Sequence, residues 1–183
     1  MRKVYILLVL AVLLAGFTLS VIQKERGLAK GRDVLLALAP VDPRALLMGD
    51  YMTLEYSINA AIRKALLGRE RSDSKEDHKP SGRAVVHLFS DAGNDRLENV
   101  LEFIRLDNGT PLLEGEFYLA YRVWGTSVVT AAPAFYFHEG QGKIYERARY
   151  GRLRLDDAGG SLLVALCDAF GRDIVSNGEE NRP

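Results

Sequence analysis

An uninterrupted apolar run near the N-terminus constrains this chain more than any other feature. Residues Val4–Val21 read VYILLVLAVLLAGFTLSV and contain no charged side chain. These 18 residues, at about 1.5 Å each, make a helix of roughly 27 Å, close to the thickness of the hydrocarbon core of a bilayer. A helix that is apolar on every face is atypical of a soluble surface helix. The run therefore predicts one N-terminal transmembrane helix, with residues 1–24 as a signal anchor that contacts the lipid bilayer through residues 4–21.

A cleaved signal peptide is the competing interpretation of this run, because Arg2 and Lys3 form a short basic lead. No small-x-small cleavage site follows it, and no cysteine stands directly after it for a lipoprotein anchor. We therefore expect the anchor to be retained. Four basic residues follow the run and two precede it, so a simple count favours the opposite topology. Long domains translocate largely regardless of flanking charge, and we predict a single pass with the C-terminal domain outside the cytoplasm.

The composition limits what the rest of the chain does. The 183 residues suffice for one domain with a sizeable core. Lysine plus arginine and aspartate plus glutamate number 24 each, and this zero net charge argues against nucleic-acid binding. The one cysteine, Cys167, ends an apolar run that starts at Leu162 and resembles a buried strand. We interpret it as a small core residue and not as a nucleophile.

The chain after the anchor divides into a tether, one domain and a tail. Residues 25–32 are polar and basic and form the tether, and residues 33–175 form the domain. Within the domain, residues 69–82 are dense in charge, contain proline and glycine, and carry nothing apolar to bury, which predicts a mobile loop. Residues 176–183 are polar and predict a disordered tail.

Period-two alternation and turn residues predict an α+β domain that is mainly antiparallel β, with a sandwich or barrel-like shape. We expect six to eight strands and two short helices. The expected helices are Asn59–Leu67, which Gly68 ends, and Lys143–Tyr150. The turn residues Asp107–Thr110 predict a hairpin between the strands on either side of them. The expected strands are Asp33–Pro40, Tyr51–Ile58, Arg83–Phe89, Val100–Leu106, Glu116–Val123, Val128–Phe137 with a break at Pro133, Arg152–Leu155 and Ser161–Cys167.

The segment GDYMTLEY, which contains Gly49, Asp50, Tyr51, Leu54 and Tyr56, rises above this background. Gly49 permits a backbone conformation that other residues avoid, and the Asp50 carboxylate can accept hydrogen bonds from turn amides. In a strand, Tyr51 lies on the face opposite Leu54 and Tyr56. The pattern therefore predicts a turn-to-strand corner with Leu54 and Tyr56 in the core and Tyr51 outside or against a loop.

The same segment resembles the signature of the GDYXXLXY family of bacterial membrane-anchored proteins, and it matches every named position. Two further stretches, Pro40–Tyr51 and Phe135–Glu146, also look family-typical. The resemblance implies an N-terminal anchor in the bacterial cytoplasmic membrane, a β-rich extracytoplasmic domain, and pairing with a polytopic membrane protein. It implies no known reaction.

The three histidines show no metal-ligand spacing, and we therefore predict no metal ligand. We also predict no catalytic residue and no cofactor. The expected function is that of a non-catalytic accessory subunit of a polytopic membrane protein. A binding module for an envelope glycan or peptide is the alternative, and a hydrolase that uses Asp50 with Asp42 or Glu55 is a further one. The candidate binding surface comprises Arg44, Gly49, Asp50, Tyr51 and Trp124, of which Trp124 is the aromatic residue we expect to be most exposed.

Overall fold

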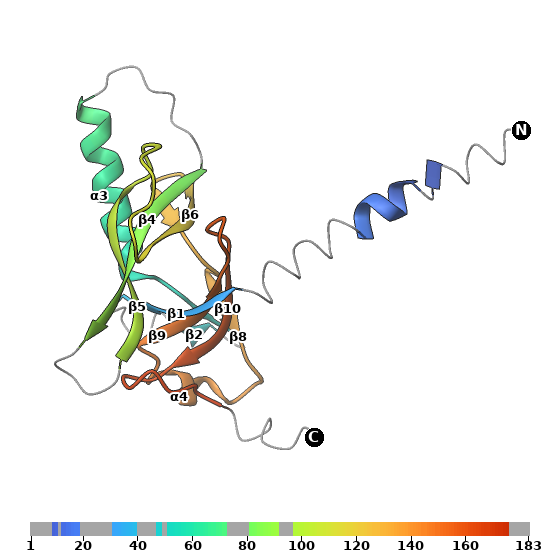
Figure 1. Cartoon of the computed structure of the whole chain (residues 1–183). Coiled ribbons are helices and arrows are strands. Elements are labelled where there is room, and N and C mark those ends of the chain that lie inside the picture. The colour runs from blue at the N-terminus through green and yellow to red at the C-terminus, as the bar shows by residue number, and fades with distance from the viewer. Residues whose placement is uncertain are drawn as a thin grey trace, which may run out of the picture.

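A computed structural model describes residues 9–10, 12–18, 31–39, 47–48, 51–72, 81–91 and 97–175. A seven-stranded sheet dominates the domain, in the order β10-β9-β1-β5-β4-β6-β7 (Figure 1). A second sheet has three strands, in the order β2-β3-β8. The strands of the large sheet are β1 (Arg32–Ala37), β4 (Ser81–Asp91), β5 (Leu97–Leu106), β6 (Glu116–Trp124), β7 (Ser127–Val129), β9 (Tyr150–Leu155) and β10 (Ser161–Cys167). The small sheet contains β2 (Leu47–Met48), β3 (Tyr51–Thr53) and β8 (Ala134–Tyr136), and the two helices of the domain are α3 (Ser57–Ser72) and α4 (Gly142–Tyr145).

Nearly all strand pairs are antiparallel, and this part of the predicted fold class is confirmed. The exception is β1 with β5, which run parallel and pair at Leu35 and Val100. The large sheet curls into a half-barrel, because the turn between β9 and β10 reaches β6. The Ala120 amide of β6 donates to the Gly159 carbonyl at 2.8 Å, and the Ser161 hydroxyl donates to the Thr130 carbonyl at 2.9 Å.

The hairpin expected around residues 107–110 is wrong, although the turn itself forms. The Gly109 amide donates to the Asp107 carboxylate at 3.0 Å, as the turn chemistry indicates. However, β5 and β6 do not pair, because β4 lies between them and pairs with both. Strand β4 has 11 residues and is long enough to serve as the centre of this part of the sheet. The chain therefore crosses the end of β4 instead of turning back beside β5.

Strand number and helix length also differ from the expectation. Ten strands form among the described residues, seven in one sheet and three in the other, because β2 was not expected and the strand expected at Val128–Phe137 divides into β7 and β8. Helix α3 has 16 residues and continues through Gly68, which does not adopt the left-handed conformation of a stop. The strand expected to reach Ile58 ends at Thr53. Helix α4 ends at Tyr145, and Tyr150 already belongs to β9.

Most of the core lies on the concave face of the large sheet. Strand β1 shows the division, since Val34 and Leu36 are buried in the main cluster whereas Leu35 belongs to a separate small cluster. Helix α3 contributes Ile58 and Ile62 to the main cluster. The domain thus consists of a curled sheet around a core that α3 and the small sheet complete.

The N-terminal run is described only in part. Residues 9–10 and 12–18 are helical, and among the described residues no helix is long and apolar enough to cross a membrane. The tether expected at 25–32 lies largely outside the described residues, and Arg32 already begins β1. Of the loop expected at 69–82, the described ends belong to α3 and β4, and residues 73–80 lie outside, as do residues 176–183 of the expected tail.

Candidate functional site

The predicted corner lies in the small sheet. Met48 of β2 pairs with Tyr51 of β3, and Gly49 and Asp50 between them lie outside the described residues. Arg44 also lies outside them. The structure therefore tests only the second half of the signature, from Tyr51 to Tyr56.

The prediction that Leu54 and Tyr56 are core residues is confirmed. Leu54 is 4% exposed and Tyr56 2% exposed. The Tyr56 hydroxyl donates to the Ala132 carbonyl at 3.1 Å, and burial raises the pKa of this phenol above its ordinary value. Gly151 of β9 makes room for the ring, because a Cβ there would lie 3.2 Å from Tyr56 Cε1. Tyr56 thus anchors the corner to the half-barrel.

Tyr51 points the other way and forms an aromatic contact on the surface. Tyr51 pairs across the strands with Tyr136 of β8, and their ring centroids are 5.5 Å apart. Tyr51 is partly buried, whereas Tyr136 is 75% exposed. We call these two residues the tyrosine pair. The sequence did not single out Tyr136 as a site residue. Its contact with Tyr51 depends on the register between β3 and β8, which are far apart in the chain.

An aromatic cluster continues from the tyrosine pair along β8 to α4. The Phe135 ring lies edge-on to the buried Tyr145 ring at 5.0 Å, and Phe137 stacks on the same ring at 5.3 Å. Phe135 and Phe137 pack against the main core. Tyr136 therefore lies on the exposed face of a segment whose opposite face packs aromatic rings against the core.

Trp124 is exposed, as predicted, with 84% of its surface accessible. It ends β6 and pairs with Ser127 across a two-residue turn. Trp124 belongs to the large sheet and Tyr51 to the small one. Figure 1 shows β6 in the upper half of the domain and β2 and β8 in the lower half. The structure does not bring these two predicted site residues together in one cleft.

The buried Cys167 shows no sign of an activated nucleophile. It is fully buried, and its thiol donates to the Asp173 carboxylate at 3.2 Å. Burial first, and the bond to Asp173 second, raise the pKa of the thiol from 9.0 to about 11. Because a nucleophilic cysteine needs a lowered pKa, the interpretation of Cys167 as a core residue is confirmed. Within the described part of the chain, no group of histidine, cysteine and carboxylate side chains could hold a metal ion.

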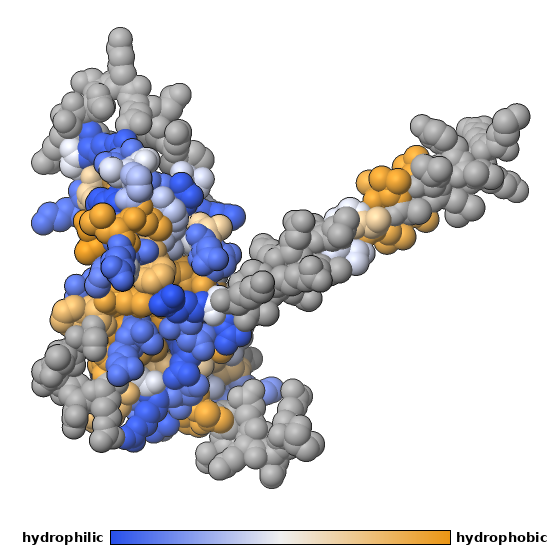
Figure 2. All heavy atoms as spheres, in the orientation of Figure 1, coloured by the Kyte–Doolittle hydropathy of each residue, from blue (hydrophilic) through white to orange (hydrophobic). Residues whose placement is uncertain are grey.

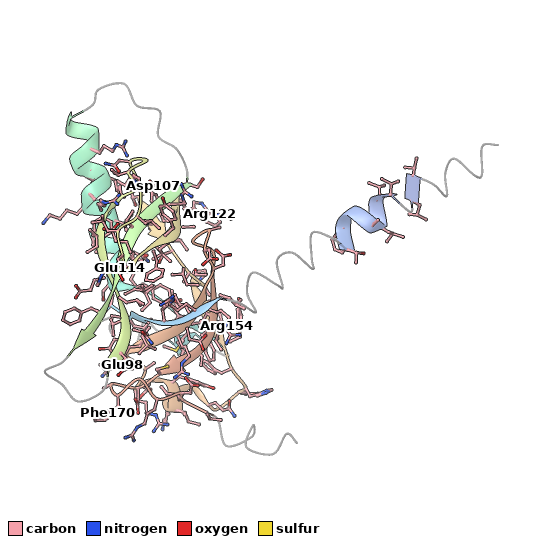
Figure 3. All side chains as sticks on the ribbon, viewed as in Figure 1. Glu98, Asp107, Glu114, Arg122, Arg154 and Phe170 are labelled. Carbon is pink, nitrogen blue, oxygen red and sulfur yellow. The ribbon has the colours of Figure 1, made fainter. Side chains whose placement is uncertain are left out.

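A pocket of about 220 Å³ lies at the junction of β1 and β5, and sequence reasoning did not find it. Its wall includes Glu98 and Asn99 of β5, Arg152 of β9, and the loop that follows β10. Figure 3 shows Glu98 and Phe170 at the same lower edge of the domain. No local sequence pattern indicates this pocket, because Asn99 precedes the strand that the sequence predicts from Val100 and the segments that line the pocket are far apart in the chain. Asp33, Val34, Leu35, Glu98, Asn99, Arg152, Phe170 and Gly171 line it.

The helical residues of the N-terminal run expose their apolar side chains. Their exposed fractions range from 42% at Val9 to 71% at Phe17. Figure 1 shows this helix standing away from the domain, and Figure 2 shows its hydrophobic surface in orange. The domain therefore does not bury these side chains.

Comparison with known proteins identifies a family that this chain matches. The model of the family described as GDYXXLXY protein matches residues 13–166, which is most of the chain. The matched range includes the signature and nearly all of both sheets. No curated protein and no solved structure matches the chain.

Proposed function

The chain belongs to the GDYXXLXY family, and we propose that it is a membrane-anchored, non-catalytic accessory subunit of a polytopic membrane protein. In this proposal residues 4–21 cross the bacterial cytoplasmic membrane once, and the domain lies outside the cytoplasm. The tyrosine pair, next to the Gly-Asp half of the signature, is the docking surface.

The apolar surface of the N-terminal helical residues supports the anchor. Val12, Leu13 and Phe17 are each more than 60% exposed, so none of them gains the free energy of burial within the chain. Side chains of this kind are stable in lipid or against another apolar surface. The run of 18 residues without charge supplies the length that a span requires.

The tyrosine pair is the observation that carries the docking part of the proposal. Tyrosine side chains contribute large contact area at a small loss of side-chain entropy, and tyrosine is enriched at the centres of protein interfaces. The same corner has Leu54 and Tyr56 for stability and Tyr51 for contact. One short signature can therefore serve both the fold and a partner surface.

Cross-linked affinity purification of the full chain from native membranes tests the proposal. We expect one polytopic membrane protein in near-equal amount with the unmodified chain. Tyr136→Ala and Tyr51→Ala should each reduce the recovery of this partner protein at least severalfold, because each removes one ring of the tyrosine pair. Trp124→Ala is the matched control, since it deletes a more exposed aromatic side chain from the other sheet.

The outcomes separate the parts of the proposal. Loss of the partner with Trp124→Ala but not with Tyr136→Ala would reject the tyrosine pair as the docking surface. Recovery of no specific partner by any variant that is folded and membrane-bound would reject the subunit function. Extraction of the chain from membranes by high salt or carbonate, without detergent, would reject the anchor.

Binding of an envelope glycan or peptide is a second candidate, which the exposure of Trp124 favours. Trp124 is the only tryptophan of the chain, so its fluorescence reports directly on ligands that stack on it. A saturable change of this emission on titration with envelope glycans or peptides supports the candidate. An unchanged emission across these ligands contradicts it.

A further inference from the structure

The pocket at the junction of β1 and β5 is shaped by a bulge in β5. Leu97 pairs with Asp91 and Val100 with Phe89, so β5 has one residue more than β4 between these two pairs. Asn99 lies in this bulge with φ of 66°, and it is the one described residue other than glycine with a positive φ. Asparagine tolerates this conformation better than most residues do. The bulge therefore interrupts the regular ladder where β5 approaches β1 and contributes Glu98 and Asn99 to the pocket wall.

The loop that follows β10 forms the opposite wall and is held firmly. The Asp168 carboxylate accepts hydrogen bonds from the amides of Phe170 at 2.8 Å and Arg172 at 3.0 Å. Arg152 donates to the Gly171 carbonyl at 3.1 Å. This network holds Phe170 at the edge of the pocket with 65% of its surface exposed. The Arg172 guanidinium lies 5.4 Å from the centroid of the Phe170 ring and occupies one face of it. The remaining exposed surface of the ring is available for contact with a ligand.

The charges around the pocket leave one carboxylate without a partner. Arg154 forms an ion pair with Asp33 at 3.0 Å, and Arg152 forms one with Asp173 at 3.0 Å. Glu98, which is exposed, has no hydrogen bond or ion pair with any residue that the structure describes. Among the described residues, Glu98 is therefore the carboxylate of the pocket lining that has no ion pair, and Phe170 lines the same pocket.

We propose that this pocket binds the guanidinium or ammonium group of an organic cation. Glu98 supplies the counter-charge and hydrogen-bond acceptors, and Phe170 supplies the ring face that Arg172 does not occupy for a cation–π contact. The Asn99 amide offers a further acceptor beside Glu98. A volume of about 220 Å³ is below that of a typical drug-sized site, and it suits one cationic group better than a large ligand. This site is distinct from the tyrosine pair and does not depend on the proposed docking function.

NMR titration of the ¹⁵N-labelled full chain in detergent micelles tests the proposal with two small probes. Methylguanidinium carries the proposed charge, and methylurea has nearly the same shape without charge. We expect methylguanidinium to shift the amide signals of Glu98, Asn99, Phe170 and Gly171 saturably. Methylurea should leave them unchanged, because it does not neutralise the carboxylate.

Three variants identify the groups that bind the cation. Glu98→Gln should weaken methylguanidinium binding about tenfold, since a charge-assisted hydrogen bond is lost. Phe170→Leu should weaken it about two- to fivefold, the range expected of an exposed cation–π contact. Glu114→Gln is the matched control, because Glu114 is an exposed glutamate that does not line the pocket. It should leave the affinity unchanged.

A second arm distinguishes a free cation from a side chain of a polypeptide. An acetylated Gly-Gly-Arg-Gly-Gly amide that binds at least tenfold more tightly than methylguanidinium identifies a polypeptide as the source. Equal affinities for the peptide and for methylguanidinium identify a small cation as the source of the charge. Absence of saturable shifts with both probes, equal shifts with methylurea, or equal weakening by Glu114→Gln and Glu98→Gln would overturn the proposal.

Discussion

The two faces of the large sheet differ in what they bury. The concave face holds the main core, to which the signature contributes Leu54 and Tyr56. On the other face, among the residues that the structure describes, Leu35, Leu97 and Cys167 form a small buried cluster under the loop after β10. Charged residues and the pocket surround this small cluster. Most buried side chains therefore lie on the concave face, so substitutions there should lower stability more than substitutions on the other face.

Truncation of Tyr56 should have the largest effect on stability. Tyr56→Ala removes a ring that is 2% exposed and should lower the free energy of unfolding by about 3–5 kcal/mol. Chemical denaturation of the full chain in detergent measures this loss. Tyr136→Ala, at a position 75% exposed, should change the value by less than about 0.5 kcal/mol. Equal losses for the two variants would contradict the assignment of the signature to both core and surface.

Alkaline pH should have the next largest effect on the free energy of unfolding, through the small cluster that contains Cys167. Burial first, and the hydrogen bond to Asp173 second, raise the pKa of the Cys167 thiol from its ordinary 9.0 to about 11 in the folded chain. Below pH 9 the thiol is protonated in both states, and its contribution to stability is complete. Between pH 9 and 11 the unfolded chain loses the proton first, so up to about 2–3 kcal/mol is lost.

Comparison with Cys167→Ala isolates this contribution, because Tyr56 and other groups also titrate at alkaline pH. The stability difference between the unmodified chain and this variant should decrease as the pH rises from 9 to 11. Denaturation curves at several pH values measure that difference. A difference that stays constant across this range would contradict the raised pKa.

An alanine at Gly171 should strain the loop over the small cluster. Gly171 has φ of 72°, and a Cβ there would lie 3.0 Å from Leu97 Cδ2. Gly171→Ala should therefore cost about 1–2 kcal/mol in unfolding free energy. Gly68→Ala, in a helix with no atom within 4 Å of the added Cβ, should instead stabilise by up to about 1 kcal/mol. Effects of the same sign for both would reject the strain at Gly171.

The exposed ion pair on the outer face of the large sheet should contribute least to the free energy of unfolding. Arg154 and Asp33 have side chains that are 37% and 51% exposed. Arg154→Gln should lower the unfolding free energy by less than about 1 kcal/mol at low salt, and the effect should fade as salt screens the pair. Denaturation in low and high salt measures both quantities. A loss of several kcal/mol would contradict the small contribution expected of this exposed ion pair.

Local patterns predicted much of the fold. Alternation predicted that Leu54 and Tyr56 are buried, although the strand itself ends at Thr53. The strands expected at Arg152–Leu155 and Ser161–Cys167 form as β9 and β10, which pair with each other. The order of the strands was not, because β4 pairs with β5 and β6 through contacts that no local pattern records.

The site follows the same division. The sequence by itself determined that Tyr51 lies opposite Leu54 and Tyr56, that Trp124 is exposed and that Cys167 is buried, since side-chain alternation and hydrophobicity act over a few residues. Only the tertiary structure brought Tyr136 beside Tyr51 and placed Glu98 and Phe170 at one pocket. These pairs depend on strand register and sheet curvature, which result from the packing of the whole core.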